Sequence, residues 1–100
     1  MVKTALRLHE IVEDIHGLEA ELAVLEDRYG LLSPDFYHLY KTGELDQTKD
    51  FIQWVGYYEA KLARQSLYRE VLYEHLRRLR QAEGRSSLRL LPEAVPAGGA

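Results

Sequence analysis

The chain has 100 residues and a mass of 11.6 kDa, which leaves room for one small domain. Its 13 basic and 16 acidic side chains give a net charge of −3, a balance that argues against a dedicated nucleic-acid-binding protein. It has no cysteine, which excludes disulfides, thiolate metal sites and cysteine nucleophiles, and no apolar run approaches the roughly 20 residues that cross a bilayer. We therefore expect a soluble, cytoplasmic protein without a membrane segment.

Apolar residues in the first third of the chain recur in alternating steps of three and four, which is the spacing of a heptad seam. This spacing predicts a helix over about 4–29, roughly 40 Å long at 1.5 Å per residue. Gly30 is the expected stop, because glycine accepts the left-handed backbone conformation that ends many helices. The seam consists of Leu8, Ile11, Ile15, Leu18, Leu22, Leu25 and Tyr29, and Val12 and Val24 widen it.

The middle of the chain is dense in helix start and stop signals. Ser33-Pro34-Asp35 predicts a helix start, with Ser33 as the N-cap, Pro34 at the first helical position and Asp35 facing the positive end of the helix dipole. Thr42-Gly43 predicts its end, so we expect a short aromatic helix over about 33–41. Residues 44–49 are expected to form a polar loop.

A second long helix is predicted over about 50–83, with Gly84 as its stop. Gln65 and Arg69 interrupt its apolar stripe, which we interpret as a stutter where the buried face rotates around the helix. Residues 85–100 are expected to form a flexible tail, because they are rich in Pro and Gly. The predicted stripe passes through Val55, Tyr58, Leu62, Leu72, Leu76 and Leu79.

Together these elements predict an all-α fold in which residues 1–84 form a long antiparallel helical hairpin with a short intervening helix. A lone hairpin covers only half of each apolar stripe, so we expect self-association into a homodimer or larger four-helix-type bundle, or burial against another protein. Charge favours the antiparallel hairpin, since residues 1–50 carry a net −6 and residues 51–100 a net +3. Folding is expected to bring acidic residues near basic ones, namely Glu10, Glu13 and Asp14 near Arg77, Arg78 and Arg80.

Catalytic and metal-binding patterns are sparse. Glu13 and His16 have the Glu-x-x-His spacing of di-iron helical bundles, but the second pair that such a site needs does not occur. The chain offers no recognisable Ser-His-Asp set, phosphate loop or pair of catalytic carboxylates. We therefore expect a non-enzymatic protein with no metal and no cofactor.

Two sets of residues are candidates for binding. Tyrosine and tryptophan dominate interface hot spots but also pack in cores, and the acidic face of the first helix can attract a cationic surface. The expected partner-binding residues are Glu10, Glu13, Glu19, Glu21, Phe36, Tyr37, Tyr40, Trp54 and Tyr57. The second set is Arg77, Arg78 and Arg80, which complement the helix dipole or, alternatively, contact nucleic acid or an acidic protein.

The middle of the chain also carries a longer pattern, made of Tyr29-Gly30, Ser33, Phe36-Tyr37, Gly43-Glu44-Leu45, Asp50-Phe51, Trp54 and Tyr58-Glu59. It resembles a signature of short prokaryotic helical proteins that are encoded beside a small toxin and act as its antitoxin-like partner. The resemblance covers about residues 20–75 and transfers no catalytic residues. It implies a protein–protein interaction protein of the antitoxin-like kind. The acidic first helix adds the expectation that this protein blocks a small basic partner such as a toxin. The alternatives are a nucleic-acid-binding autoregulator that uses the arginine-rich helix end, and a purely structural homo-oligomer.

Overall fold

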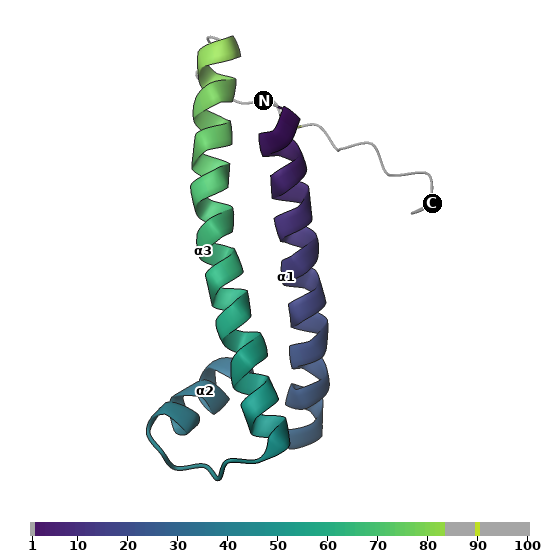
Figure 1. Cartoon of the computed structure of the whole chain (residues 1–100), viewed down its shortest axis with the longest axis vertical. Coiled ribbons are helices and arrows are strands. Elements are labelled where there is room, and N and C mark those ends of the chain that lie inside the picture. The colour runs from purple at the N-terminus through teal and green to yellow at the C-terminus, as the bar shows by residue number, and fades with distance from the viewer. Residues whose placement is uncertain (1, 84–89, 91–100) are drawn as a thin grey trace, which may run out of the picture.

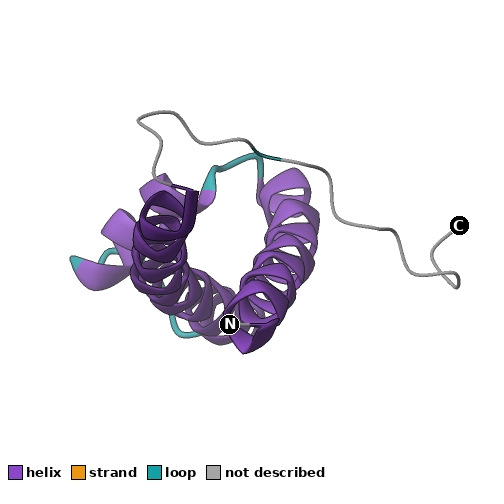
Figure 2. Ribbon diagram, turned by 90° about the horizontal axis from the view of Figure 1, so that it is seen from above, coloured by secondary structure: helices purple, strands orange, loops and turns teal. Residues whose placement is uncertain are grey.

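The structure is a computed structural model that describes residues 2–83 and residue 90. This part of the chain contains three helices, α1 (Val2–Tyr29), α2 (Ser33–Lys41) and α3 (Lys49–Glu83), and no strand. α1 and α3 lie side by side in opposite directions, and α2 lies beside the beginning of α3 at the closed end of the hairpin (Figure 1). The view along the hairpin shows the same helices joined by short loops (Figure 2).

The expected all-α hairpin with a short intervening helix is therefore confirmed. The helices begin and end within two residues of their predicted bounds. The predicted tail over residues 85–100 lies outside the described residues, except for Leu90, which is exposed. Among the helices described, none is both long and apolar enough to span a membrane.

Glycines end the first two helices, as predicted. Gly30 has a φ of +66°, and its N–H and that of Leu31 donate to the carbonyl of Glu26 at 2.8 and 3.3 Å. Gly43 ends α2 with a φ of +78°. Thr48, which the sequence pattern places in the loop over 44–49, caps the start of α3. Its Oγ1 accepts the N–H of Phe51 at 3.1 Å.

The core lies at the closed end of the hairpin, where the three helices meet. It is built from the buried residues Leu22 and Leu25 of α1, Phe36 of α2 and Trp54 of α3. The Phe36 and Trp54 rings stack with their centroids 3.8 Å apart and their planes 3° from parallel. Toward the open end of the hairpin, Ile11 is the one apolar residue of the described side chains that is fully buried. Tight packing is therefore concentrated at the α2 end.

Ser33 has a different role from the predicted one. The N-cap of α2 is Leu32, which makes no side-chain cap, and Ser33 is the first helical residue. Its hydroxyl donates to Glu26 Oε2 at 2.7 Å and accepts the indole N–H of Trp54 at 2.9 Å. Because Ser33 is 2% exposed, these bonds join one residue from each helix inside the core.

The predicted stutter in α3 is wrong. Leu62, which was assigned to the apolar stripe, is 39% exposed, whereas its neighbour Lys61 is half-buried and its ammonium lies 3.5 Å from Glu19 of α1. Half-buried residues instead continue from Trp54 at unbroken heptad spacing, and two of these positions are polar. They are Tyr58, Lys61, Gln65, Tyr68 and Leu72. Val24 is 53% exposed, so it does not widen the buried stripe of α1 either.

Candidate functional site

One flank of the hairpin is closed by polar contacts between α1 and α3. Arg28 Nη1 donates to Asp50 Oδ2 at 2.9 Å, and Arg64 Nε lies 3.6 Å from Asp14 Oδ2. Between these pairs, the carboxylate of Glu21 raises the pKa of Tyr57 through its charge and a hydrogen bond. Each helix contributes residues one heptad apart, which lie along one side of a helix. We call this side the polar flank: Asp14, Glu21 and Arg28 of α1, with Asp50, Tyr57 and Arg64 of α3.

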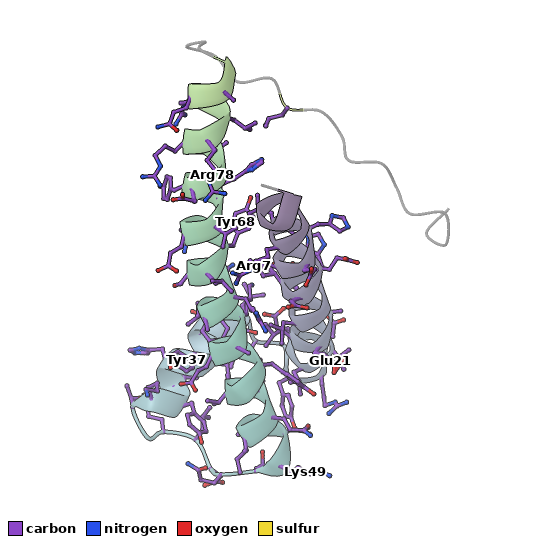
Figure 3. All side chains as sticks on the ribbon, turned by 45° about the horizontal axis from the view of Figure 1, so that its top comes forward. Arg7, Glu21, Tyr37, Lys49, Tyr68 and Arg78 are labelled. Atoms are coloured by element: carbon purple, nitrogen blue, oxygen red, sulfur yellow. The ribbon has the colours of Figure 1, made fainter. Side chains whose placement is uncertain are left out.

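The ion pairs fix how the two helices are aligned. In each pair between α1 and α3 the two residue numbers add up to 78–80, so Arg77 is level with the first residues of α1. The predicted meeting of the acidic residues with Arg77, Arg78 and Arg80 is therefore wrong, since Asp14 pairs with Arg64 instead. Arg77 and Arg78 pair with Glu74 of their own helix, and Figure 3 shows Arg78 near the free end of α3.

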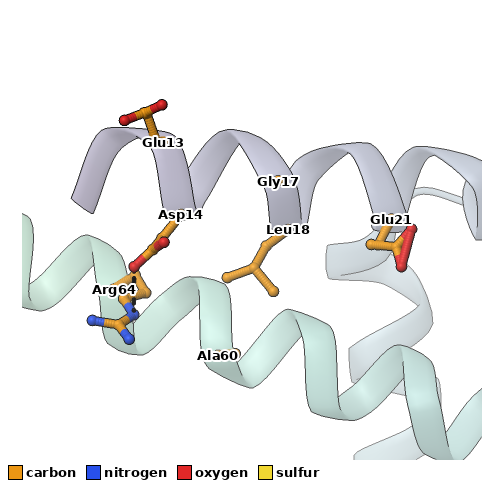
Figure 4. A pocket seen from close by; sticks show the side chains of 7 residues that line it. All are labelled: Glu13, Asp14, Gly17, Leu18, Glu21, Ala60 and Arg64. Atoms are coloured by element: carbon orange, nitrogen blue, oxygen red, sulfur yellow. Dashed lines mark ion pairs between the residues drawn. The ribbon is translucent and has the colours of Figure 1, made fainter. Parts of the chain in front are cut away.

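A groove opens in the polar flank between Asp14 and Glu21, with a volume of about 460 Å³ (Figure 4). Leu18 points toward α3 in this groove, beside Gly17 and Ala60, while Glu13 points away from α3 at its outer edge. A Cβ added to Gly17 would meet no atom within 4 Å, so the hollow coincides with two small residues on facing helices. A second hollow of about 270 Å³ contains Val71, one heptad beyond Arg64, and so extends the groove along this flank.

The groove is negatively charged. Three carboxylates line it, those of Glu13, Asp14 and Glu21, against the single guanidinium of Arg64. That guanidinium already pairs with Asp14. The Glu13 carboxylate has a weaker partner, the imidazole of His9 at 3.4 Å, which is charged only when it is protonated. A cationic side chain entering near Glu13 or Glu21 is thus favoured electrostatically.

The polar flank has short hydrogen bonds at the closed end of the hairpin. Tyr29 donates its hydroxyl to the Asp50 carboxylate at 2.5 Å, which also accepts from Arg28. These two hydrogen bonds, that of Tyr29 first, lower the pKa of Asp50. The same bond to Asp50 raises the pKa of Tyr29. This corner joins the end of α1 to the beginning of α3.

Only part of the predicted partner-binding set gathers at this groove. Glu13 and Glu21 line it and Tyr57 adjoins it, whereas Glu19 pairs with Lys61 and Glu10 is exposed on α1 outside the groove lining. The structure adds Asp14 and Arg64, which the sequence reasoning did not select for binding. The sequence does contain a pattern that could have indicated them. Asp14 and Glu21 are one heptad apart on the first helix, and Tyr57 and Arg64 are one heptad apart on the last, so each pair lies on one side of its helix.

The predicted aromatic anchors divide between core and surface. Phe36 and Trp54 are 0% exposed, so they are core residues and cannot contact a partner in this conformation. Tyr37 and Tyr40 are half-buried on α2, and the Tyr37 hydroxyl donates to Glu59 at 2.7 Å. The aromatic cluster therefore holds α2 against the hairpin and presents little of itself to solvent.

Within residues 2–83 and residue 90, no group of three or more His, Asp or Glu side chains is placed to hold a metal ion. Comparison with protein-family models, with curated proteins and with solved structures found no match to this chain. The resemblance to antitoxin-like proteins therefore stays an expectation from the sequence. A functional proposal rests on the geometry of the groove.

Proposed function

We propose that this protein is a protein-binding protein of the antitoxin-like kind, which holds a small basic protein against the polar flank of its hairpin. The observation that supports this proposal is the open groove, whose lining carries three carboxylates and one already paired guanidinium. Such a groove between two helices can accept a third segment of chain, with its small residues Gly17 and Ala60 allowing close approach.

The acidic lining serves two purposes in this proposal. It raises the rate of encounter with a cationic partner, an effect that weakens as salt is added. It also selects for a lysine or arginine at the contact, because an acidic side chain would be repelled by the carboxylates of Glu13 and Glu21 and an apolar one would displace their water without replacing it. An inhibitor of this kind acts by occupying its partner's surface and needs no catalytic residue of its own.

The alternative of nucleic-acid binding by the end of α3 has weaker support. Arg77 and Arg78 both pair with Glu74, whose pKa is lowered chiefly by its hydrogen bond to Arg77. Two of the three guanidinium groups that would contact phosphates are thus partly neutralised within their own helix. Binding to duplex DNA that falls steeply with salt and is lost on removal of Arg80 would favour this alternative instead.

The proposal is tested by affinity capture from the native cell with a variant that neutralises the groove. In E13Q/E21Q two carboxylates of the groove lose their charge, and in the control D27N/D46N two exposed carboxylates elsewhere do so. Wild type and control should retain a stoichiometric small basic protein, identified by mass spectrometry. The groove variant should bind the same purified partner at least tenfold more weakly, mainly through slower association.

Two results would contradict the proposal. One is the absence of any stoichiometric basic protein in the captured material. The other is a purified partner that binds E13Q/E21Q and D27N/D46N equally well, because the groove would then take no part in the contact. An association rate that does not change between low and physiological salt would remove the electrostatic steering alone.

A further inference from the structure

The side of the hairpin opposite the groove is only half covered. It is partly apolar, since aliphatic Val12, Val55, Leu62 and Leu76 share it with charged Glu19, Glu26 and Arg69. On α1, Val12, Glu19 and Glu26 lie at successive heptad positions and so on the same side of the helix. Glu26 marks this side as the one next to α2, because it accepts a hydrogen bond from Ser33. On α3, Leu62, Arg69 and Leu76 follow Val55 at heptad steps, and Val55 packs against the core cluster. We call this side the apolar flank. Its lower end is covered by α2.

Above α2, no helix of the described chain covers the apolar flank. Leu62 of this stripe is 39% exposed, and Tyr73, one turn beyond Arg69 on the neighbouring stripe of α3, is 71% exposed. A shallow hollow of about 110 Å³ lies on the same flank, lined by Val12, Ile15, His16 and Tyr68. The arrangement is that of a bundle in which a third helix is present at one end and missing at the other.

We propose that a second copy of this chain covers the apolar flank, in a two-fold dimer in which the two hairpins are antiparallel. The position of α2 selects this orientation. Two hairpins packed through this flank in the same direction would bring their α2 helices into collision. In the antiparallel arrangement the α2 of each copy lies at the free end of the other copy's α3, so each α2 and each second hairpin cover successive parts of the flank.

The dimensions of the flank fit this occupant. The part of α3 above α2 runs from about residue 60 to residue 83, which is about 36 Å at 1.5 Å per residue. Two helices side by side are about 20 Å wide, so an overlap of about 30 Å gives a footprint of roughly 600 Å² per copy. This is close to the ~800 Å² that each partner buries in a stable protein–protein interface.

Charge complementarity favours the same arrangement. Residues 33–48, which contain α2 and the following loop, carry three carboxylates and one ammonium, whereas the end of α3 carries Arg80 in addition to Arg77 and Arg78, which pair with Glu74. Glu59, Tyr73 and Arg80 lie at multiples of seven along α3 and so share one stripe. A two-fold axis midway between residues 59 and 80 places each Arg80 beside the Glu59 of the other copy. Arg69 lies near this axis, and its long side chain can extend its guanidinium to solvent at the edge.

The first test measures the oligomeric state of the full chain by sedimentation equilibrium, from 1 to 500 µM. Wild type should have twice the chain mass of 11.6 kDa. L62K/Y73K places two ammonium groups on the apolar flank and should raise the dissociation constant at least tenfold. The control V24K/I52K makes the same kind of change at two aliphatic residues, 53% and 55% exposed, at the closed end of the hairpin and outside the overlap of residues 60–83, and should dimerise like wild type. Circular dichroism confirms that each variant is folded.

The second test determines the orientation, and uses the fact that the chain has no cysteine. When E59C and R80C chains are mixed and oxidised, an antiparallel dimer should yield disulfide-linked pairs that contain one chain of each kind. Each variant has a single cysteine, so a disulfide within one chain cannot form, and positions 59 and 80 are about 32 Å apart along one helix, so a link between them reports antiparallel packing. R80C chains that link mainly to one another would show a parallel dimer and overturn the proposal. A wild-type monomer at every concentration, or equal dissociation of L62K/Y73K and V24K/I52K, would overturn it as well.

Discussion

At the scale of single residues, Ser33 connects the parts of the core most directly. Its hydroxyl donates to Glu26 of α1 and accepts from Trp54 of α3, while its own backbone belongs to α2. Its N–H also donates to Glu26 at 2.8 Å. A local pattern in which serine precedes proline predicts a helix cap, but here the hydroxyl serves a tertiary contact. Each buried polar atom in this corner thereby finds a partner.

Replacement S33A should destabilise the fold by about 1–3 kcal/mol, because the buried indole N–H of Trp54 would lose its acceptor. Urea unfolding followed by circular dichroism measures this difference. Q53A, at an exposed site of α3 outside the proposed interface, is the control and should change stability by less than about 0.5 kcal/mol. Equal effects of the two substitutions would show that the hydrogen bonds of Ser33 contribute nothing net.

At the scale of the elements, replacing a glycine should have opposite effects on stability at a helix end and inside a helix. Gly30 and Gly43 have positive φ at the ends of α1 and α2, where a side chain is strained whatever the space around it. Gly56 lies inside α3, where it contributes only backbone freedom to the unfolded chain. No neighbouring atom lies within 4 Å of the Cβ that an alanine would add at Gly30 or Gly56. The backbone conformation alone therefore decides the sign of each substitution.

G30A should lower the free energy of unfolding by about 1–2 kcal/mol, because alanine resists the left-handed conformation. G56A should raise it by about 0.5–1 kcal/mol, because alanine favours the helix. Both values come from the same chemical denaturation experiment, so that each variant controls for the other. Changes of the same sign would contradict the assignment of Gly30 as the residue that ends α1.

At the scale of the whole molecule, the two flanks of the hairpin make different kinds of contact. The polar flank carries the cross-links that align α1 with α3, and the apolar flank carries α2 and the surface left open above it. The most bonded cross-link is Asp50 with Tyr29 and Arg28, at the corner where the hairpin closes. Because the pKa of Asp50 is lowered in the fold, its contribution to stability is present above the ordinary value near 3.8 and is lost as the pH falls through the lower, folded value.

D50N should therefore be less stable than wild type at pH 7, and the two should converge as the pH falls below about 4. Y29F removes the hydrogen bond that lowers this pKa most and should show part of the same convergence. Urea midpoints measured between pH 7 and pH 2.5 give the comparison. A stability difference between D50N and wild type that is independent of pH would show that the carboxylate is not stabilised in its charged form.

The elements of this fold follow from local patterns, whereas their mutual placement does not. Heptad spacing from Leu8 to Tyr29 and the glycines at 30 and 43 suffice to predict α1, α2 and their ends. The alignment of α1 with α3 depends on how α2 and its loops return the chain, and no short window of sequence contains that information. For this reason Arg77 was expected opposite the acidic residues that in fact lie level with Arg64.

The groove was predictable in part. The acidic character of the first helix identified Glu13 and Glu21, but the hollow is lined by residues of both helices, Gly17 of α1 and Ala60 of α3, whose placement depends on that alignment. Similarly, the shift of the stripe from Leu62 to Lys61 reflects an ion pair with Glu19 that apolar periodicity cannot reveal. The sequence could not show whether Trp54 is buried or exposed for binding, because the residue that covers it, Phe36 of α2, is distant in sequence and meets it only in the folded chain.

The chain has one tryptophan, and it stacks on the α2 residue Phe36. The indole also stacks on Tyr29 of α1, so its emission reports on the closed end of the hairpin, while the helical signal as a whole is dominated by the length of α1 and α3. Emission that turns red before ellipticity is lost would mean that the closed end opens first and the long helices unfold afterwards. Simultaneous loss of both signals would mean that the hairpin unfolds cooperatively with the closed end, and that α1 and α3 do not stay paired without it.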